Sequence, residues 1–458
     1  MRNVLVLSLS LLLLIAPGEL MGATYVFGED GNNQDLTGTG GPGSTWPSGN
    51  TYIIAGDVYV PDDSTLTLEA GVKVYFDYDY DLDYTTYPTI EVRGTLVCEG
   101  TSVSYVYFTN YSGTNRGEFQ GLKANGSLSS GYEGTIEAAY TIFEYGGRNG
   151  ALITLGADSY LEMSNSWVRF SDSCGIGTSA EFDSLKMEWC CVDSNDAEGI
   201  QISHSCDAVI LNDVIAFENG ICLQAGRPRL EYRGVYVENA RHNGIELDTN
   251  QEPHIQNPVW RILIERSHAY HCAENGIYIN AREEGLYGDI RNCASAGNGE
   301  NGILVDAYDP FAQEEPFRVL NSVFWDNGES GIKVIPTETW LDQEEDIFII
   351  QNCILGLNEE YGLEVIDGDY VIDFGDNINA YKDNGDGSYN LAVEPPEDEI
   401  KDMDDVPDHF ELADETYTNQ NPPQHPPYDF HIKWDSPELD ERTLINEGEE
   451  DEDCGQDV

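Results

Sequence analysis

The segments Gly244-Ile245-Glu246-Leu247-Asp248, Gly276-Ile277-Tyr278-Ile279-Asn280 and Gly302-Ile303-Leu304-Val305-Asp306 share one pattern. In each of them a glycine is followed by Ile, and apolar and polar residues then alternate with a period of two. This alternation predicts a short β-strand with one buried face. The glycine is typical of the bend that precedes such a strand.

The same pair of residues, Gly followed by Ile or Leu, recurs through the middle of the chain. Its glycines are Gly175, Gly199, Gly220, Gly244, Gly276, Gly302, Gly331 and Gly362, with spacings of 24, 21, 24, 32, 26, 29 and 31 residues. Repeats of this length indicate a stacked array in which each coil buries its apolar residues against its neighbours. A coil of this size has room for three short strands and three bends, and no helical periodicity interrupts it.

Two further columns precede the glycines. About ten residues before the glycine lie Asn165, Asn292, Asn321 and Asn352. Asn favours a left-handed bend, and we expect its amide to bond the same residue one coil away. The next position holds the small residues Ser166, Cys190, Ser267, Cys293, Ser322 and Cys353, which we expect to point inward. Cysteines several coils apart, at about 4.8 Å per coil, are too distant to pair. We interpret them as buried free thiols; the alternative for an exported chain is a disulfide framework.

Several stretches resemble a known group of proteins. They are residues 54–61, 65–76, 90–101 and 106–109 near the N-terminus and 428–437 near the C-terminus. All are similar to coils of secreted right-handed parallel β-helix proteins of the pectate-lyase-like superfamily. The resemblance implies an all-β fold, a single-stranded right-handed parallel β-helix (solenoid) of about 10–12 coils. It implies no single activity, because the group includes lyases, hydrolases and adhesins.

The chain divides into five parts by composition. Residues 1–23 have a positive start, an apolar run and small residues, which predict a secretory signal peptide and hence a secreted or cell-surface protein. Residues 24–52 are predicted to form an N-terminal lead and cap, and residues 53–391 are predicted to form the β-helix. Residues 392–440, rich in Pro and acid, predict a long excursion and a final coil with a strand at 428–434. The acidic residues 441–458 are expected to be disordered.

The charge balance limits the partners. Asp and Glu number 84 against 22 Lys and Arg, for a formal charge of -62. Nucleic-acid binding needs basic residues and is therefore not expected. The mature chain has no apolar stretch of membrane-spanning length, and we expect a monomer. The charge also counts against acidic polysaccharides unless cations bridge them.

One exposed column suggests catalysis. Four residues after successive glycines come Asp248, Asn280 and Asp306. Asp248 and Asp306 should lie two coils, about 10 Å, apart. That separation is near the upper end for the acid and base of an inverting glycosidase. We assign Asp248, Arg282 and Asp306 as candidate catalytic residues. The alternative is an ordinary polar row on the outside of the coil.

Basic residues gather between positions 227 and 291, where an anionic ligand or the base of a polysaccharide lyase would have to lie. We assign ligand binding to Arg241, His242, Arg266, Asn280 and Asp309. The alternative is that these arginines pair locally with the abundant Asp and Glu. Motifs typical of polygalacturonases (Gly-His-Gly) and pectate lyases (Trp-Ile-Asp-His) are missing, so recognised signatures do not support an enzyme.

An acidic column precedes the glycines by two residues. Glu274, Glu300 and Glu329 occupy it, together with Glu218 and Glu360, and His242 interrupts it. Carboxylates about 5 Å apart repel unless they are bridged. We therefore assign these three as candidate ligands for Ca²⁺, which prefers oxygen donors. The alternative is a solvated acidic edge.

These features favour an exported β-helix that binds carbohydrate or another extracellular polymer, or that serves as a surface scaffold. The alternative is a polysaccharide lyase or glycoside hydrolase, with Ca²⁺ as the one cofactor under consideration. The sequence disfavours an enzyme but does not exclude one.

Overall fold

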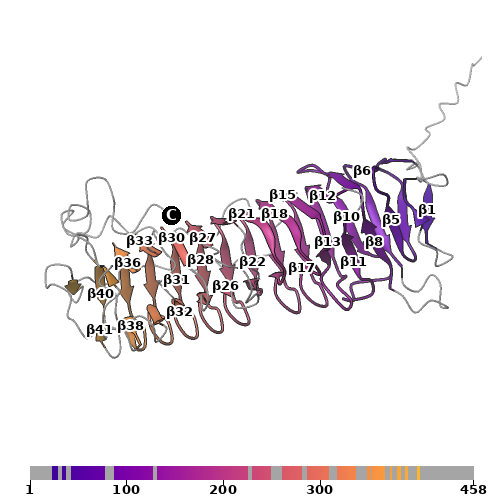
Figure 1. The fold of residues 1–458 in the computed structure, drawn as a ribbon. Helices are drawn as coiled ribbons and strands as arrows, with labels where there is room; N and C mark the ends of the chain where they lie inside the picture. Colours follow the sequence, from indigo (N-terminus) through magenta and orange to yellow (C-terminus); the bar gives the residue numbers. More distant parts are fainter. Residues whose placement is uncertain are drawn as a thin grey trace, which may run out of the picture.

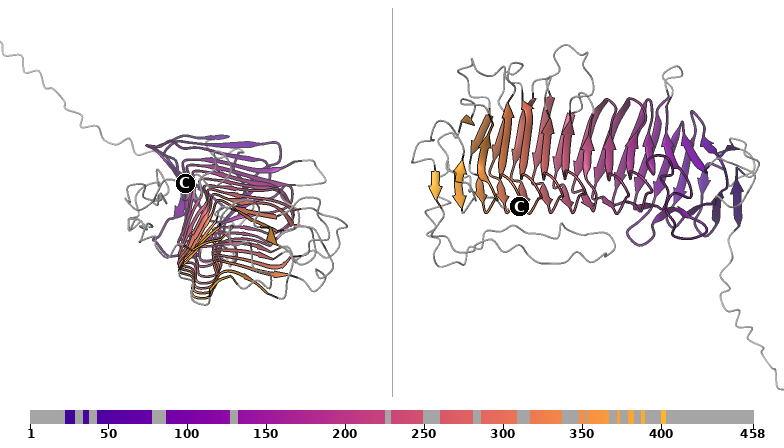
Figure 2. Two further views of the ribbon diagram at one scale, coloured as in Figure 1. Left: turned by 90° about the vertical axis from the view of Figure 1, so that its left-hand side faces the viewer. Right: turned by 90° about the horizontal axis from the view of Figure 1, so that it is seen from below.

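The chain winds into one parallel β-helix, seen from the side in Figure 1 and in two further views in Figure 2. The computed structural model describes residues 23–28, 34–37, 43–77, 87–126, 132–224, 229–248, 260–280, 286–308, 317–336, 348–351 and 353–366, and strands at 372–373, 379–382, 387–389 and 400–402. All described strands of the coil pair in parallel, each with the strand one coil before and one coil after.

Three sheets run the length of the helix, and each coil adds one strand to each of them in turn. Sheet I consists of β1 (Thr24–Phe27), β4 (Thr51–Ile54), β7 (Lys73–Phe76), β10 (Val106–Asn110), β13 (Thr141–Glu144), β16 (Trp167–Arg169), β19 (Cys191–Asp193), β22 (Ile215–Phe217), β25 (Tyr236–Glu238), β28 (His268–Tyr270), β31 (Ala294–Ala296), β34 (Val323–Trp325), β37 (Ile354–Gly356), β40 (Asn379–Lys382) and β42 (Ile400–Asp402).

Sheet II consists of β2 (Gln34–Asp35), β5 (Val58–Val60), β8 (Thr89–Val92), β11 (Gly121–Ala124), β14 (Ile153–Leu155), β17 (Ile176–Thr178), β20 (Ile200–Ile202), β23 (Ile221–Leu223), β26 (Ile245–Asp248), β29 (Ile277–Asn280), β32 (Ile303–Tyr308), β35 (Ile332–Pro336), β38 (Tyr361–Val365) and β41 (Gly387–Tyr389).

Sheet III consists of β3 (Thr45–Trp46), β6 (Thr65–Glu69), β9 (Thr95–Glu99), β12 (Gly134–Ala139), β15 (Ser159–Ser164), β18 (Phe182–Glu188), β21 (Cys206–Asn212), β24 (Arg229–Arg233), β27 (Trp260–Glu265), β30 (Leu286–Arg291), β33 (Phe317–Leu320), β36 (Phe348–Gln351) and β39 (Ile372–Asp373).

The Gly-Ile repeat sets the register of sheet II. The residue after each repeat glycine pairs with its counterpart on the next coil, from Ile176 through to Leu363. The predicted strands and their stacking are therefore confirmed. The expected 10–12 coils are too few, because sheet I alone has 15 strands. The short strands β2 and β3 already form a coil within residues 24–52, and β40 to β42 continue the stack beyond β38.

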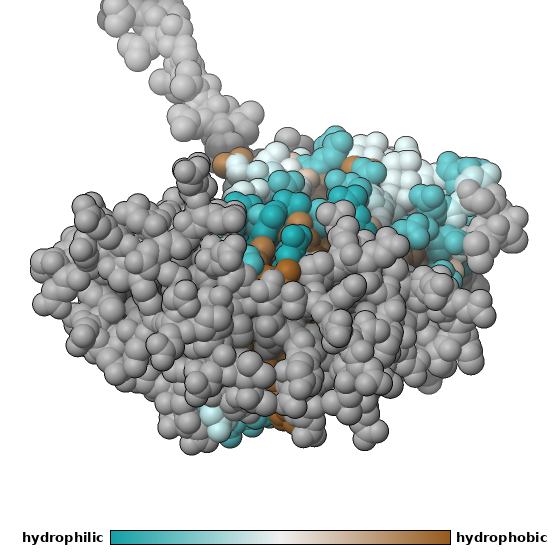
Figure 3. All heavy atoms as spheres, turned by 60° about the vertical axis from the view of Figure 1, so that its left-hand side comes forward, coloured by the Kyte–Doolittle hydropathy of each residue, from teal (hydrophilic) through white to brown (hydrophobic). Residues whose placement is uncertain are grey.

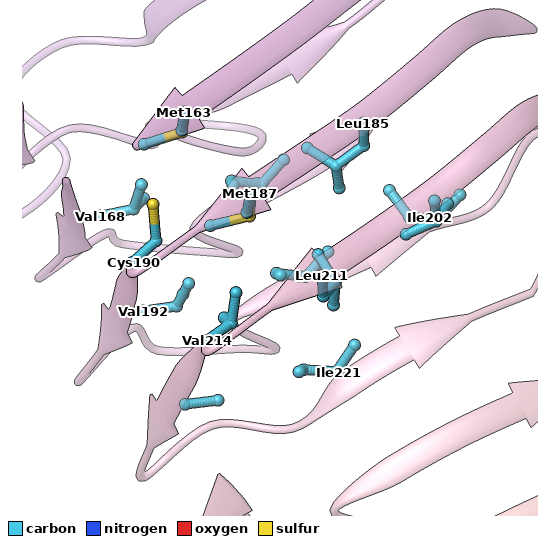
Figure 4. Packing of buried hydrophobic residues seen from close by; sticks show 14 of the residues in the cluster. Met163, Val168, Leu185, Met187, Cys190, Val192, Ile202, Leu211, Val214 and Ile221 are labelled. Atoms are coloured by element: carbon cyan, nitrogen blue, oxygen red, sulfur yellow. The ribbon is translucent and has the colours of Figure 1, made fainter. Parts of the chain in front are cut away.

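All three sheets contribute to one apolar interior. Met163, Met187 and Leu211 from sheet III face Val168 and Val192 from sheet I across it, as Figure 4 shows. The small-residue column lies in the same interior, where Ser166, Cys190, Ser267, Cys293, Ser322 and Cys353 are at most 1% exposed. Cys190, Cys293 and Cys353 are buried thiols outside any disulfide, as we interpreted them, and so are the other six cysteines among the described residues, so the disulfide framework does not hold for that part of the chain.

The predicted bend at the asparagine column is confirmed, and within the described residues no side-chain hydrogen bond joins Asn292 to Asn321. Asn165, Asn292 and Asn321 have φ of 50°, 58° and 48°, in the left-handed region; Asn352 lies outside the described residues. The side-chain ladders that the structure describes lie elsewhere, in the turns from sheet I to sheet II. There Asn327 Oδ1 accepts the backbone N–H of Asn298, at 3.3 Å, and its amide group, at 2.9 Å. Asn358 repeats both contacts with Asn327.

Candidate functional site

The predicted column forms on the outer face of sheet II, but its side chains are half-buried or buried and not exposed as expected. Asp248 pairs with Asn280 and Asn280 with Asp306, on β26, β29 and β32. Adjacent strands lie about 4.8 Å apart, so Asp248 and Asp306 are separated by about 10 Å. Asn280 is buried, at 6% exposure, between the two half-buried aspartates. The three side chains therefore form one continuous polar row across three coils.

A second polar row runs beside the first. It lies two residues earlier on the same strands, where Glu246 pairs with Tyr278. The Tyr278 hydroxyl donates to Asp306 Oδ2 at 3.5 Å, which joins the two rows. Burial, and then the negative charges of Asp306 and Asp248, raise the pKa of Tyr278 to about 12. The phenol therefore stays protonated at neutral pH and remains a hydrogen-bond donor.

Glu246 is held at the edge of this face. Its carboxylate accepts hydrogen bonds from Asn243 Nδ2 at 3.0 Å and from Gln224 Nε2 at 3.4 Å. The neighbouring Cys222 is 5% exposed, and burial followed by the charges of Glu246 and Glu198 raises the pKa of its thiol. Cys222 is therefore a protonated, unreactive thiol at neutral pH.

Glu198 lies on the turn that leads into β20. Its Oε2 accepts the backbone N–H of Gly220 at 3.1 Å. Burial raises the pKa of Glu198, His242 lowers it, and Glu246 raises it further. These charge interactions join the turn to the sheet face. Together Glu198, Glu246, Asp248, Tyr278 and Asp306 form an acidic surface, which we call the sheet II acidic face.

Glu246, Tyr278, Glu198 and Cys222 were not assigned from the sequence. Glu246 and Tyr278 could have been found, because a strand residue two positions from an outward residue also points outward. Glu198 could not, since it precedes its glycine by one residue, a position that holds Asn and no acid in the next four coils.

The acidic ladder stacks as predicted from His242 onward. The backbone N–H groups of Glu274, Glu300, Glu329 and Glu360 each donate to the carbonyl of the ladder residue one coil earlier. Glu218 belongs to a different column, because it bonds Glu238 in a shorter turn and has a φ of 57°.

Each carboxylate of the predicted metal set has a protein partner. Glu274 contacts His242 Nδ1 at 3.1 Å, and Asn275 Nδ2 donates to Glu300 at 3.0 Å. Glu329 accepts from Asn301 Nδ2 at 3.1 Å and pairs with Lys333 at 3.2 Å. Within the described part of the chain, no three His, Cys, Asp or Glu side chains converge closely enough to hold a metal ion. Calcium binding at Glu274, Glu300 and Glu329 stays a prediction.

Most arginines whose side chains are described in the basic region have local partners. Arg233 and Arg291 both bond Glu265 at 2.9 Å, on the outer face of sheet III. Arg241 donates to the carbonyl of Asp196 at 2.7 Å, in the turns between sheets I and II. Arg266 is exposed in the bend between sheets III and I, at a φ of 50°.

The predicted ligand residues are therefore divided among different faces. Arg241 and His242 lie near the sheet II acidic face, and Asn280 belongs to its polar row. Arg266 is on another edge of the coil, because a residue in the bend after sheet III cannot reach sheet II. Arg282 and Asp309 lie outside the described residues, so only Asp248 and Asp306 of the catalytic set can be placed.

The described surface is largely hydrophilic in the view of Figure 3, with small apolar spots between polar residues. No helix in the described ranges is long and apolar enough to cross a membrane.

Two kinds of solved structure show partial similarity to this chain. No family model matches the chain, and no curated protein matches it. The catalytic domain of a GH87 α-1,3-glucanase in complex with nigerose aligns with 75% of this chain at 10% identity and a TM-score of 0.37. The chain spans 63% of the length of that domain. The A-module of the Azotobacter vinelandii mannuronan C-5 epimerase AlgE6 aligns with 79% of this chain and 90% of its own, at 13% identity and a TM-score of 0.28.

Proposed function

We propose that this protein is an exported β-helix that binds a neutral carbohydrate polymer along the sheet II acidic face. One observation carries the proposal: Asp248, Asn280 and Asp306 are in register on three consecutive strands. The Asp248 and Asp306 carboxylates can accept hydrogen bonds from sugar hydroxyls. A flat row of such groups suits an extended chain of hydroxyl-bearing units.

Charge favours a neutral ligand. The chain carries a formal charge of -62, and the described arginines of the basic region are engaged with acidic groups or backbone or lie on another edge. An acidic polysaccharide would be repelled from carboxylates that no cation bridges. A neutral glucan or mannan is not repelled.

The experiment measures retention of the full chain on immobilised neutral and acidic polysaccharides, with and without Ca²⁺. The test variant is Asp248→Ala combined with Asp306→Ala. The matched control is Glu137→Ala combined with Glu188→Ala, which removes two exposed carboxylates from the outer face of sheet III. Both variants change the net charge equally. Loss of two hydrogen bonds to charged groups should weaken binding by roughly ten-fold or more.

Two results contradict the proposal. If neither neutral nor acidic polysaccharides retain the protein, the chain is a scaffold and not a carbohydrate-binding protein. If the sheet III control loses affinity as much as the sheet II variant does, the polymer binds elsewhere.

The second candidate function is glycoside hydrolysis or polysaccharide cleavage at the same row. It is favoured by the separation of about 10 Å between Asp248 and Asp306, near the upper end for an inverting pair. In this case one aspartate protonates the leaving oxygen and the other activates water, with Arg282 as a further candidate. Release of new reducing ends or unsaturated sugars, abolished by Asp248→Asn while retention persists, would identify the enzyme. Retention without product release identifies the binding protein.

A further inference from the structure

The outer face of sheet I carries a long apolar strip. The outward residues of successive strands pair in the order Tyr107, Ile142, Trp167, Cys191, Ile215, Tyr236, His268, Ala294, Val323 and Ile354. Apolar members of this row, with Tyr270 and Ala296 from the next outward row, form a hydrophobic cluster separate from the interior of the helix. We call these residues, from Ile142 to Ile354, the sheet I strip.

The strip is covered, although it points away from the interior. Trp167 is 3% exposed, Tyr236 1% and Ile354 0%, values typical of core side chains. Outward residues on sheet III such as Glu137 and Lys186 are exposed, which is the ordinary state for the outside of a coil. The row is also more open at its N-terminal end, where Tyr107 is half-buried and Lys73 is exposed. A covering layer therefore lies over the middle and C-terminal coils.

Topology limits which segment supplies that layer. The undescribed internal segments alongside the strip, at 225–228, 249–259, 281–285, 309–316 and 337–347, all connect sheet II to sheet III, on the other side of the coil. Among the described loops near the strip, the long one at 111–120 makes its contacts at the turns between sheets I and II, where Arg116 pairs with Asp196. The undescribed segments before residue 132 belong to the open N-terminal coils, and those within 367–399 are at most ten residues long, so the segment after β42 is the one long enough to cover the strip.

The C-terminal segment begins directly after a strand of sheet I, the sheet that carries the strip. The last described strand, β42, belongs to sheet I itself, and residues from 403 onward follow it. From β42 back to β25 is six strands, about 29 Å at 4.8 Å per coil. The 25 residues between Asp402 and Tyr428 reach up to about 85 Å when extended. The segment Tyr428-Asp-Phe-His-Ile-Lys-Trp434 then alternates apolar and polar residues with a period of two.

We propose that residues 403–434 fold back along the outer face of sheet I and that Tyr428, Phe430, Ile432 and Trp434 pack on the sheet I strip. The alternating residues Asp429, His431 and Lys433 then face solvent. An extended segment of this length spans about 20 Å, or about four coils. The strip is thus an intramolecular docking surface for the strand that the sequence predicts at 428–434.

The chain's own segment is a better occupant than a second copy. Two copies would bring two formal charges of -62 together, and like charges of that size repel. A tethered segment also has a high effective concentration at the strip, without the entropy cost of bringing two molecules together.

The first experiment places a photocrosslinking residue, p-benzoylphenylalanine, at position 430 of the full chain and, as the matched control, at position 431. Mass spectrometry of the irradiated monomer should join position 430 to peptides of β13 to β37. Position 431, on the opposite side of the segment, should give little of that product. Crosslinks from 430 to sheets II or III overturn the proposal, and a crosslinked dimer assigns the strip to a second copy instead.

The second experiment measures the chemical accessibility of His268, which lies on the strip and is 4% exposed. Burial lowers its pKa to about 4, so its imidazole is neutral and open to diethyl pyrocarbonate wherever it is accessible. His242, whose side chain is 62% exposed, is the internal reference. With the cover closed in about nine molecules of ten, His268 should react roughly ten-fold more slowly than His242.

Substitution of the segment should remove that protection. The full-chain variant Phe430→Asp with Trp434→Asp should make His268 react nearly as fast as His242. Asp429→Asn with Lys433→Gln, on the opposite face of the segment, should leave it protected. Far-ultraviolet circular dichroism checks that the β-helix is intact in both variants. Equal protection of His268 in all three proteins means that the segment is not the cover, and the proposal fails.

Discussion

At the residue scale, the position of an asparagine within the coil decides what it does. Asn321 sits in the bend from sheet III to sheet I, and it supplies the left-handed φ that the sequence predicts. Asn327 lies in the next turn, is 1% exposed, and uses its side chain to satisfy a buried backbone N–H. Both are asparagines in register with the repeat. The sequence pattern could not separate the two roles, because only the turn geometry decides which side chain points inward.

Replacing Asn327 by Ala should therefore destabilise the protein strongly. The change leaves the buried N–H and amide of Asn298 without the acceptor that they share. A buried donor without a partner costs about 1–3 kcal/mol, so the free energy of unfolding should fall by about 2–4 kcal/mol in denaturant titration. Asn115→Ala, at an exposed loop position, should cost less than about 0.5 kcal/mol. Equal effects of the two changes would mean that the ladder contributes no stability.

Glu198 should make stability depend on pH. Its folded-state pKa is raised, chiefly by burial, so it stabilises the fold only in acid, and that contribution is lost as the pH rises through the folded pKa. Glu198→Gln keeps an acceptor for Gly220 N–H but carries no charge. Thermal melts should show the variant with a higher melting temperature than the natural protein at pH 7 and no higher one near pH 4. The exposed Glu137→Gln serves as control; a destabilised Glu198→Gln at pH 7 would contradict this account.

At the scale of single strands, alternation predicts the inward face well and the outward face poorly. The inward residues of sheet II were identified from period two alone, and the structure confirms their register. Sheet I differs, since its strands carry adjacent apolar residues such as Trp167-Val168 and Ile354-Leu355, with one on each face. Runs of this kind indicate a strand buried on both faces. In a three-residue strand the run is too short to be told from ordinary alternation.

An outward isoleucine on sheet I should behave like a core residue. Ile215 points away from the interior but is 6% exposed, whereas Ile210 on sheet III points outward and is half-buried. Ile215→Ala should lower the free energy of unfolding by about 2–4 kcal/mol, as for a buried aliphatic side chain. Ile210→Ala should cost clearly less, near 1 kcal/mol. If both changes cost the same in parallel denaturant titrations, burial of the outer face contributes nothing to stability.

At the scale of the whole molecule, the repeat predicts the fold. Stacked coils place residues that recur at the same position of the repeat in one column in space. The same reasoning predicts only part of the candidate site. Asp248, Asn280 and Asp306 come together because they are in phase with the repeat, whereas Arg266 was grouped with them by nearness in sequence. In a coil of 21–32 residues, neighbours in sequence lie on different faces. Proximity along the chain is therefore a poor guide to a shared site.

The ladder carboxylates are also in register with the repeat, so their mutual repulsion shows how the whole molecule tolerates its formal charge of -62. Monovalent salt should raise the melting temperature by screening repulsion among exposed carboxylates. Burial, followed by the charges of Glu329 and Glu274, raises the pKa of Glu300, so ionising this carboxylate opposes folding at neutral pH.

A cation bound between ladder carboxylates would offset that repulsion and stabilise the folded state by mass action. CaCl₂ should then raise the melting temperature further than NaCl or MgCl₂ at matched ionic strength, and Glu300→Gln should remove the difference. Equal shifts in the three salts would mean that the ladder is a solvated edge whose carboxylates are satisfied by His242, Asn275, Asn301 and Lys333 alone.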